Sequence, residues 1–345
     1  MINANIRGIA VAFPENSVSN EDYPFNKIEG LSKHWLDFWG AKRRFKLKRE
    51  DGEYSSSIGK KACLKVLEST QTNPEEIDAL ICNTSSFYKW SAEYNQILPR
   101  LSEVLKKELG CKNATTYDID HSCLSSAIEL QLANGLLRNG HAQKVLVCSA
   151  EGMSNVLDYT DNLSTVFGDG ASAILLEAEE AINKTGLLSS SYITNAKYYS
   201  LAVGQWRKPK LEREDLCELG IYLNMGAGVT KNMAAFVPNL VPDATKDCLS
   251  KIGMQIDDID FAIFHQTSQA MVNIWATKLR IPKEKYLLAI ENVACLSSAS
   301  VPNTLKIALS EGKIKKGDII LLAGAAVGWS GYAQIWKISN SIIVN

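Results

Sequence analysis

The sequence carries almost no net charge. Its 345 residues include 37 Lys and Arg and 38 Asp and Glu, so the formal net charge is -1. A chain without a surplus of basic residues gives no electrostatic reason to expect nucleic acid or an anionic membrane as its main partner. The one basic run, residues 42–49, is typical either of a solvated edge or of a docking patch for an acidic or phosphate-bearing partner.

Long hydrophobic runs are also missing. The apolar stretch near the N-terminus is too short for the core of a signal peptide, and Pro14 follows it closely. No later segment reaches the roughly 18 uninterrupted apolar residues that a membrane-spanning helix needs. We therefore expect a soluble protein with no membrane segment.

The sequence lacks the cysteine spacing of a metal site or of a disulfide-stapled domain. Its eight cysteines include no CxxC pair and are spread over the whole chain. Such usage is typical of reduced thiols in a cytoplasmic protein. We expect no bound metal and no cofactor.

Apolar segments of two kinds alternate along the chain, and 46% of the residues are hydrophobic, enough for a sizeable core. Residues 6–13, 79–84 and 144–149 have the pattern of strands, while 55–68 and 95–109 have helical periodicity. Strands that are apolar on both faces and alternate with helices favour an α/β fold whose mostly parallel sheet is covered on both sides.

Cys123 lies where an extended segment, 115–119, runs into an apolar-periodic helix. The residues predicted to face the core recur every four positions: Leu124, Ile128, Leu132 and Leu136. A thiol at the start of a helix lies near unpaired N–H groups and the positive end of the helix dipole, which favour the thiolate. The alternative is a structural cysteine, since free cysteines are among the most buried residues.

The second half of the sequence repeats the first. Residues 77–83 match 259–265, and the Cys-Leu-Ser-Ser-Ala sequence at 123–127 recurs at 295–299. A glycine that precedes a strand-like segment recurs in the register of the second match, as Gly140 and Gly312. We interpret these matches as duplication of an α/β unit, with one half at 1–180 and the other at 181–345.

The duplication predicts which side chains meet. His265 falls at the strand end that Asn83 occupies in the first half, and Cys295 falls at the turn that Cys123 occupies. Strand ends related by a pseudo-twofold axis lie together, so Cys123, His265 and Cys295 are expected to converge. A histidine beside a helix-start cysteine is a candidate base or carbonyl donor, although a lone histidine after an apolar strand is more often a core residue.

These residues carry a resemblance to the ketoacyl-acyl-carrier-protein synthase III family of thiolase-fold condensing enzymes. The matching pieces are residues 8–15, Cys123 with its helix, 167–177, His265-Gln266, 298–302 and 324–328. The Gly-Asp-Gly at 168–170 alone is typical of any tight turn. The order of the cysteine, the Phe-Gly-Asp-Gly-Ala motif and the His-Gln pair makes the combination specific.

The resemblance implies a thiolase-like α/β fold, with duplicated αβαβα halves that form a five-layered core. It implies a dimer, either of two copies of this chain or with a different chain. It further implies that Cys123 accepts an acyl group from an acyl-carrier-protein or coenzyme A thioester. His265 then assists transfer to a second substrate, in fatty-acid-like or polyketide-like biosynthesis.

The last glycine-rich stretch has a separate implied role. In the family, the backbone N–H of this tight loop and that of the nucleophilic cysteine form an oxyanion hole, which corresponds here to Cys123 and the Val327–Gly328 turn. A phosphate-binding loop is the competing interpretation of 324–328. The segment has neither a lysine nor a following helix start, which argues against it.

Three departures from the family pattern bear on substrates. Cys295 stands where the family has an asparagine that polarises a malonyl carbonyl, and a thiol is a poor hydrogen-bond donor. Trp35 matches the tryptophan that stacks on the coenzyme A adenine, but Trp39 replaces the expected arginine. The polar segment 87–107 is long, and its Glu93 is a candidate base.

Three functions therefore stay open. The chain catalyses carbon–carbon condensation, or it transfers the acyl group to an amine, hydroxyl or carrier without decarboxylation. Alternatively it is a subunit of a heterodimeric condensing enzyme, with little or no catalysis of its own.

Overall fold

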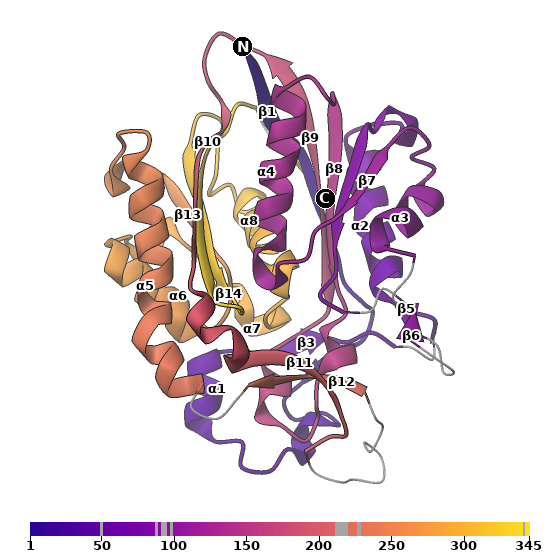
Figure 1. Ribbon diagram of the computed structural model, residues 1–345, viewed down its shortest axis with the longest axis vertical. Coiled ribbons are helices and arrows are strands. Elements are labelled where there is room, and N and C mark those ends of the chain that lie inside the picture. The colour runs from indigo at the N-terminus through magenta and orange to yellow at the C-terminus, as the bar shows by residue number, and fades with distance from the viewer. Residues whose placement is uncertain are drawn as a thin grey trace.

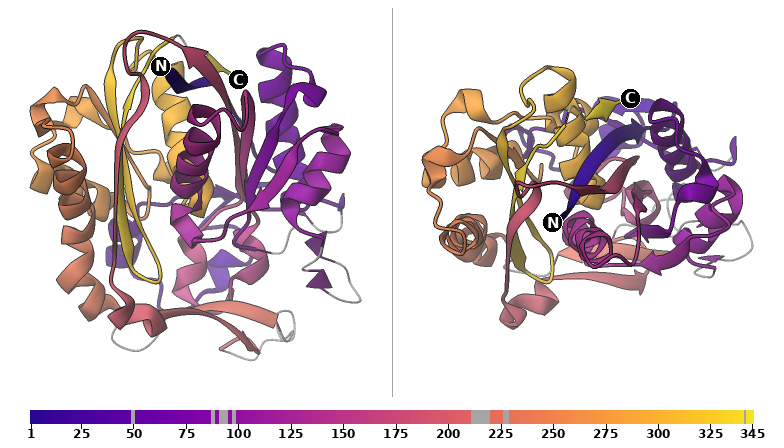
Figure 2. Two further views of the ribbon diagram at one scale, coloured as in Figure 1. Left: turned by 45° about the horizontal axis from the view of Figure 1, so that its top comes forward. Right: turned by 90° about the horizontal axis from the view of Figure 1, so that it is seen from above.

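The computed structural model describes residues 1–48, 51–86, 89–90, 95–96, 99–210, 220–225, 229–340 and 342–345. Two β-sheets face each other across a central pair of helices, and other helices cover the outer face of each sheet (Figure 1). Seen from above, these elements form successive helix, sheet, helix, sheet and helix layers (Figure 2). Separate apolar clusters fill the space between the sheets and the space on each outer side. The predicted α/β fold with a layered αβαβα core is confirmed.

The first sheet has six strands in the order β16-β1-β9-β8-β4-β7. Their bounds are β16 Ile343–Val344, β1 Ile2–Ala12, β9 Gly170–Glu180, β8 Lys144–Glu151, β4 Ala79–Asn83 and β7 Thr115–Asp118. β4 is parallel to β7 and β8, whereas β9 is antiparallel to both of its neighbours, β8 and β1. β1 and β16 are also parallel, so the described strands of this sheet all run in one direction except β9. The expectation of a mostly parallel sheet is confirmed, with β9 as the antiparallel exception.

The second sheet has four strands in the order β10-β15-β14-β13. Their bounds are β10 Gly186–Thr194, β15 Ser330–Lys337, β14 Ile319–Ala326 and β13 Phe261–Phe264. β13 and β14 are parallel, and β14–β15 and β15–β10 are antiparallel. Apart from β16, which pairs with β1, the strands of the first sheet all precede residue 181.

Each helix covers a definite face of a sheet. The bounds are α1 Lys33–Trp39, α2 Ser55–Ser69, α3 Leu101–Leu109, α4 Ser125–Arg138, α5 Val229–Ser250, α6 Gln269–Leu279, α7 Ile290–Val293 and α8 Ser300–Ser310. α2 and α3 pack on the outer face of the first sheet, α5 and α6 on that of the second, and α4 and α8 lie between the sheets (Figure 1). The helix predicted over 95–109 begins only at Leu101, because Arg100 is extended, with a ψ of 161°, and its N–H donates to the Glu103 carboxylate at 2.8 Å as the helix cap.

Three of the four residues predicted to face the core do so: Leu124 is fully buried just before the central helix α4, and Leu132 and Leu136 pack against the same cluster, but the deepest positions of α4 lie on another stripe. Its deeply buried apolar positions are Ala127, Leu130, Ala133 and Leu137, whereas the predicted Ile128, Leu132 and Leu136 are only half-buried. α4 lies between two sheets, so apolar residues occur on more than one of its faces. An i+4 repeat in such a helix does not tell which face is the deepest.

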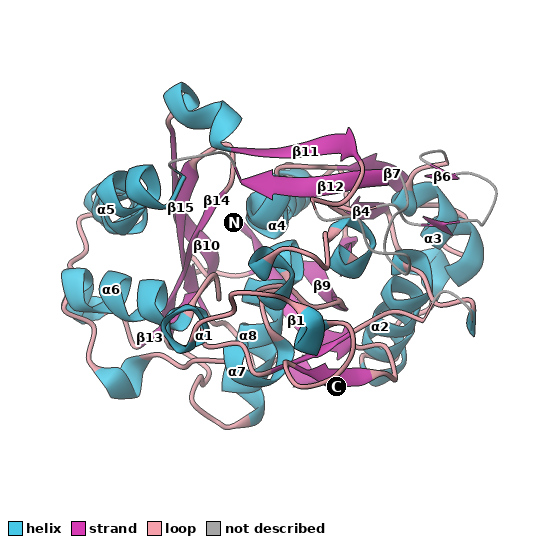
Figure 3. Ribbon diagram, turned by 90° about the horizontal axis from the view of Figure 1, so that it is seen from below, coloured by secondary structure: helices cyan, strands magenta, loops and turns pink. Residues whose placement is uncertain are grey.

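Three two-stranded ribbons complete the structure: β2 Ser17–Ser19 with β3 Arg43–Phe45, β5 Lys89–Trp90 with β6 Asn95–Gln96, and β11 Ala202–Arg207 with β12 Gly220–Met225. The β11–β12 ribbon crosses the molecule below the lower end of α4 (Figures 1 and 3). An ion pair of 2.7 Å between Arg207 Nη1 and the buried Asp158 Oδ2 ties this ribbon to the first half. Among the described helices, none has the length and apolar character needed to cross a membrane.

The connection between the two sheets depends on a glycine, which a substitution tests. Gly186 has a φ of 73°, and a Cβ there would lie 2.0 Å from the carbonyl oxygen of Ala4. Gly140 has the same φ, but its Cβ would meet nothing within 4 Å. Gly140→Ala should lower the free energy of unfolding by about 1–2 kcal/mol, the cost of a left-handed alanine. Gly186→Ala should lower the free energy of unfolding clearly more, since β10, which begins at this residue, must also move away from the Ala4 carbonyl oxygen.

Urea denaturation of the two variants and of the unmodified chain makes this comparison. Equal destabilisation by the two alanines would show that the contact between Gly186 and Ala4 does not constrain the connection.

Candidate active site

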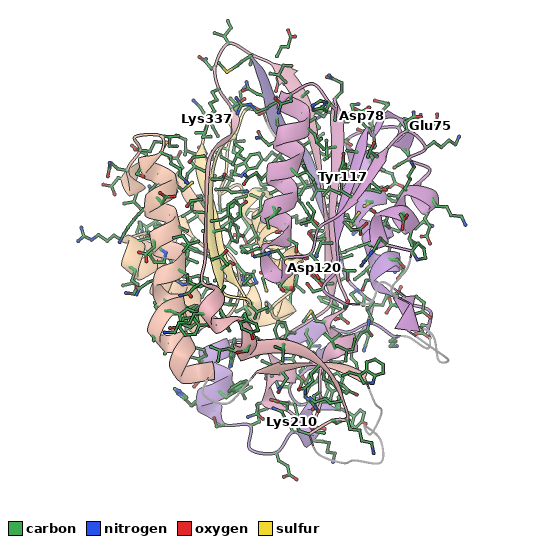
Figure 4. All side chains as sticks on the ribbon, in the orientation of Figure 1. Glu75, Asp78, Tyr117, Asp120, Lys210 and Lys337 are labelled. Carbon is green, nitrogen blue, oxygen red and sulfur yellow. The ribbon has the colours of Figure 1, made fainter. Side chains whose placement is uncertain are left out.

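Cys123 lies in a short 3₁₀ turn, η4 (Ser122–Leu124), between β7 and α4. Asp120, which Figure 4 labels at the lower end of α4, accepts the backbone N–H of Ser122 through Oδ1 at 3.0 Å. The hydroxyl of Ser125 accepts the N–H of residue 121 at 2.8 Å. Side chains thus pair with backbone groups at the start of the helical stretch. Cys123 is partly exposed there, at the predicted turn between strand and helix.

His265 follows β13 and is almost fully buried, with 1% exposure. Its Nδ1 lies 2.9 Å from the carbonyl oxygen of Ala325 on β14. A carbonyl only accepts, so Nδ1 must carry the hydrogen, and in the neutral ring Nε2 keeps a free lone pair. Gly324 permits this placement, since a Cβ at that position would lie 2.5 Å from the His265 Cβ.

Cys295 is held by the Phe-Gly-Asp-Gly motif of the first half. Its N–H donates to the carbonyl of Val166 at 2.9 Å, and its own carbonyl accepts the N–H of Gly168 at 3.1 Å. A Cβ on Gly168 would lie 2.5 Å from the carbonyl oxygen of Val293, so only glycine allows this approach. The motif therefore fixes a residue of the second half beside the site.

The structure brings Cys123, His265 and Cys295 together. The Cys295 sulfur lies 3.6 Å from His265 Nε2, and the Cys123 sulfur lies 3.6 Å from the hydroxyl of Ser297. A hydrogen bond from the Cys295 thiol, with the positive charge of His265 and the Ser297 hydroxyl, lowers the pKa of Cys123 well below its usual range. The pKa of Cys295 is raised well above its usual range, because the neighbouring Cys123 sulfur favours the neutral thiol and the thiol is buried. The arrangement supplies a thiolate beside an imidazole.

The structural equivalent of Cys123 is not Cys295. In the second half, a 3₁₀ turn η10 (Ser297–Ala299) precedes α8 as η4 precedes α4, and Ser122 and Ser297 both have positive φ, 51° and 47°. Ser297 follows Ser122 by 175 residues (297 − 122), which places Ser298 opposite Cys123. The predicted equivalence of Cys123 and Cys295 is wrong. α8 has 11 residues and α4 has 14, so an alignment offset that matches the C-terminal ends of the two helices does not match their N-terminal ends.

Ser297 was not predicted as a site residue, although it touches Cys123. The sequence does show a second serine-rich helix start, which contains Ser297. However, matching the Cys-Leu-Ser-Ser-Ala sequences at 123–127 and 295–299 aligns the two helix starts three residues out of register.

The predicted oxyanion turn is the tight connection between β14 and β15. Val327 packs partly against the apolar cluster outside the second sheet, and Gly328 is exposed with a φ of 88°. β14 contacts the η4 turn that carries Cys123. The role of the Val327 and Cys123 amides stays a prediction.

Trp35 is part of the apolar surroundings of Cys295. Its indole N–H donates to Thr165 Oγ1 at 3.0 Å, and its ring centroid is 5.4 Å from that of Trp39. Both tryptophans pack against the cluster that contains Phe167 and Cys295. The stacking of Trp35 on an adenine stays a prediction.

The basic run is only partly available for docking. Arg44 is 1% exposed, and it donates to Asn20 Oδ1 at 2.6 Å and to the carbonyl of Thr165 at 2.8 Å. Burial lowers its pKa to about 10. Lys42 is exposed but paired with Glu291 at 2.8 Å. The prediction that Arg44 belongs to a surface patch is wrong, because this arginine lies beneath the surface over the Phe25 ring.

The candidate base Glu93 lies outside the described residues, as does much of the segment around it. Within the described part of the chain, no group of three or more His, Cys, Asp or Glu side chains has an arrangement that could hold a metal ion.

The chain matches a known family in two separate segments and individual relatives over nearly its whole length. Residues 117–196 match the family described as 3-oxoacyl-[acyl-carrier-protein (ACP)] synthase III, and residues 249–338 match its C-terminal region. The chain is 35% identical over 349 residues to the 2-heptyl-4(1H)-quinolone synthase subunit PqsC of Pseudomonas aeruginosa, covering 99% of this chain and 100% of that protein. It is 28% identical to a β-ketoacyl-[acyl-carrier-protein] synthase III of Chelativorans sp., covering 97% and 100%.

Solved structures share the fold. The 3-oxoacyl-[acyl-carrier-protein] synthase III of Aquifex aeolicus matches with a TM-score of 0.83 at 25% identity, over 97% of this chain and 100% of that one. The priming β-ketosynthase of the R1128 polyketide pathway matches with a TM-score of 0.81 at 22% identity, over 98% and 97%. The second likeness concerns the fold alone.

The ionisation of Cys123 gives a direct test of the geometry. Cys295→Ala removes a hydrogen-bond donor to the thiolate, so the pKa of Cys123 should rise. A hydrogen bond to a charged group contributes about 1.5–3 kcal/mol, which corresponds to roughly one to two pH units. The midpoint is read from the rate of Cys123 alkylation by iodoacetamide as a function of pH.

Cys248→Ala is the matched control, since Cys248 is buried in the cluster outside the second sheet. Its midpoint should equal that of the unmodified chain. An unchanged or lower midpoint in Cys295→Ala would contradict the assigned donor.

Proposed function

Since the chain belongs to the 3-oxoacyl-[acyl-carrier-protein] synthase III family of thiolase-fold condensing enzymes, we propose that it acts through an acyl group held on Cys123. The acyl group comes from a thioester and passes to a second substrate. The observation that carries this proposal is geometric: Cys123 lies just before a helix, with the Ser297 hydroxyl 3.6 Å from its sulfur and the His265–Cys295 contact beside it. The lowered pKa of Cys123 agrees with this arrangement. Cys123, His265 and Cys295 are the residues to which we assign the chemistry.

The first half-reaction loads the enzyme. The Cys123 thiolate attacks the carbonyl carbon of the thioester, and the resulting oxyanion is bound by the backbone N–H groups of Cys123 and Val327. Collapse of the intermediate releases the carrier thiolate, which takes up a proton.

The second half-reaction uses His265. Because its Nδ1 hydrogen is held by the Ala325 carbonyl, Nε2, which lies beside the Cys295 sulfur, is the nitrogen that can accept a proton from the attacking group, or donate one once charged. An amine, a hydroxyl or the carbon of a β-keto acid can attack in this way. Direct transfer does not need the amide that Cys295 replaces, and this favours it over malonyl decarboxylation.

The donor is a thioester of acyl-carrier protein or of coenzyme A. With Arg44 buried and Lys42 paired, the basic run offers a carrier less charge than its composition indicates. Trp35 remains our candidate for contact with the carrier arm. The name of one relative refers to a 2-heptyl-4(1H)-quinolone. The seven carbons of the heptyl group and the ring carbon that bears it together make eight, the length of an octanoyl group, so we choose an octanoyl thioester as the first probe.

The protein works as a dimer with a second copy of this chain or with a different chain. β7 forms an edge of the first sheet and pairs with β4 on one side in the described part of the chain. Half-buried apolar residues lie at that edge, namely Tyr117 on β7 and Ile119 just after it. An open strand edge beside apolar side chains favours pairing with another chain. The described cysteines are all free, which suits a cytoplasmic protein.

The nucleophile assignment is tested by intact mass. After incubation with an octanoyl thioester, the unmodified chain and Cys295→Ala should each gain one acyl group, and Cys123→Ala should gain none. Labelling of Cys123→Ala together with loss of labelling in Cys295→Ala would reverse the assignment. Acyl transfer by the purified chain alone and with a partner chain separates an active enzyme from a subunit without catalysis.

The role of the position filled by Cys295 is tested by restoring the amide. Cys295→Asn should raise malonyl-thioester decarboxylation by about 10² to 10³, the effect of one oxyanion donor, and should slow the native transfer. Cys295→Ala, which removes the thiol and adds no amide, should leave decarboxylation slow. Fast decarboxylation by the unmodified chain would show that another group already serves as the donor.

A further inference from the structure

A buried carboxyl group lies beneath the nucleophile and has no part in the chemistry described above. Glu151 is the last residue of β8 and has no exposed surface. Its Oε2 accepts the N–H of Ser85 at 2.9 Å, and its Oε1 accepts the hydroxyl of the same serine at 3.0 Å. Oε1 also lies within a short hydrogen bond of the Ser298 hydroxyl.

The hydrogen bonds around Ser298 are all satisfied when this carboxyl group carries a proton. The amide nitrogen of Asn83 donates to the carbonyl of Ile119 at 2.9 Å, which fixes Asn83 Oδ1 as the atom that faces Ser298 Oγ, at 2.7 Å. Ser298 Oγ therefore lies between two acceptor oxygens, Asn83 Oδ1 and Glu151 Oε1, and has a single hydrogen. If Ser298 donates to Asn83, the hydrogen in the second bond must come from Glu151.

A line of hydroxyl groups joins this carboxyl group to the nucleophile. Ser85 Oγ, bonded to Glu151, lies 3.4 Å from Ser297 Oγ, and Ser297 Oγ lies 3.6 Å from the Cys123 sulfur. With Ser85 donating to Glu151 Oε1, the chain is polarised toward an ionised carboxyl group. Because Oε1 faces both Ser298 and Ser85, a hydrogen on this oxygen can turn from Ser298 to Ser85 and reverse the direction. In one direction the thiol is protonated and the carboxyl is ionised, and in the other the thiolate faces a neutral acid.

The local charges couple the two ends of this chain. Burial raises the pKa of Glu151 to about 7, and the charge on Cys123 adds to the effect. The other titratable groups that face it are Cys295 on the loop before η10 and Glu129 on α4, whose ionised forms are also negative. Two negative charges in this buried place repel each other, so loss of charge at Cys123 favours ionisation of Glu151.

We propose that Glu151 is a positioning residue that holds a proton while Cys123 is a thiolate, and that it releases this proton through Ser85 and Ser297 when Cys123 becomes acylated. This inference rests on the proposed acyl transfer. A carboxylate that served only to anchor Ser85 and Ser298 would stay ionised throughout.

The proton balance closes over the two half-reactions. In the first, the Cys123 thiolate forms the new thioester, the carrier leaves as a thiolate, and the Glu151 proton converts it to the thiol. In the second, the incoming group loses a proton as it bonds to the acyl carbon, and the Cys123 sulfur leaves as a thiolate. The released proton returns to the Glu151 carboxylate.

Infrared difference spectroscopy on the iodoacetamide-treated chain tests the coupling without any acyl substrate. Alkylation removes the charge on Cys123 as acylation does, and mass spectrometry verifies the modified residue. At pH 7, where a pKa of about 7 leaves about half of Glu151 protonated, the band of its protonated carboxyl group should be lost on alkylation. The loss should be absent in Glu151→Gln and preserved in Glu129→Gln, which alters another fully buried carboxyl group.

Labelling the unmodified chain with 13C-glutamate must shift the lost band, which assigns it to a glutamate even if Glu151→Gln does not fold. A band loss that persists in Glu151→Gln, or no loss although Cys123 is fully alkylated, would overturn the proposal. Failure of acyl transfer with an intact infrared response would contradict only the proposed function.

Ser85→Ala tests the path of the proton, since Ser85 does not touch Cys123. Release of the carrier thiol should slow at least about tenfold, a modest share of what a positioned acid contributes. Alkylation by iodoacetamide should keep its rate, because iodide leaves without a proton. Equal slowing of both reactions would show that Ser85 acts on structure alone.

Discussion

The site depends on stabilising one negative charge, that of the Cys123 sulfur, in a largely buried place. A buried thiolate is unfavourable unless hydrogen-bond donors and positive charge are brought to it. Here the donors come from the second half of the chain, through Cys295, His265 and Ser297, while the sulfur comes from the first half. The nucleophile is therefore complete only when the two sheets are held in register by α4 and α8 between them (Figure 1).

The backbone near the nucleophile is strained in a way that fits this demand. Three residues that are not glycine have positive φ here: Ser122, Ala294 and Ser297. Ser122 precedes Cys123, Ala294 precedes Cys295, and the Ser297 hydroxyl contacts the Cys123 sulfur. Such conformations cost on the order of 1–3 kcal/mol each and persist where the surroundings determine them. The surrounding contacts here are the hydrogen bonds of Cys295 to Val166 and Gly168 and the buried serine network around Glu151. Rigid packing at the site thus offsets local strain.

Much of this arrangement could be predicted from the sequence, and the failures have physical causes. The alternation of apolar strands and helices predicted the α/β fold, and the repeat predicted that Cys123, His265 and Cys295 would come together. The repeat paired Cys123 with Cys295, which is wrong. α4 is three residues longer than α8, so an alignment that fits the ends of the two helices is three residues out at their starts. Arg44 was misjudged since a charged run does not show which member turns inward. Glu151 and Ser85 carry no local pattern, and only the fold places them beneath the cysteine.

The central claim is that the acyl group is held on Cys123 with its carbonyl oxygen toward the β14–β15 turn. A crystal structure of the chain loaded with an octanoyl thioester, in the absence of a second substrate, tests this most directly. We expect a thioester on Cys123 Sγ whose carbonyl oxygen accepts the N–H groups of Cys123 and Val327, with His265 Nε2 free to face the incoming group. An acyl group bound to Cys295, or a carbonyl oxygen directed at His265 and away from both amides, would contradict the account.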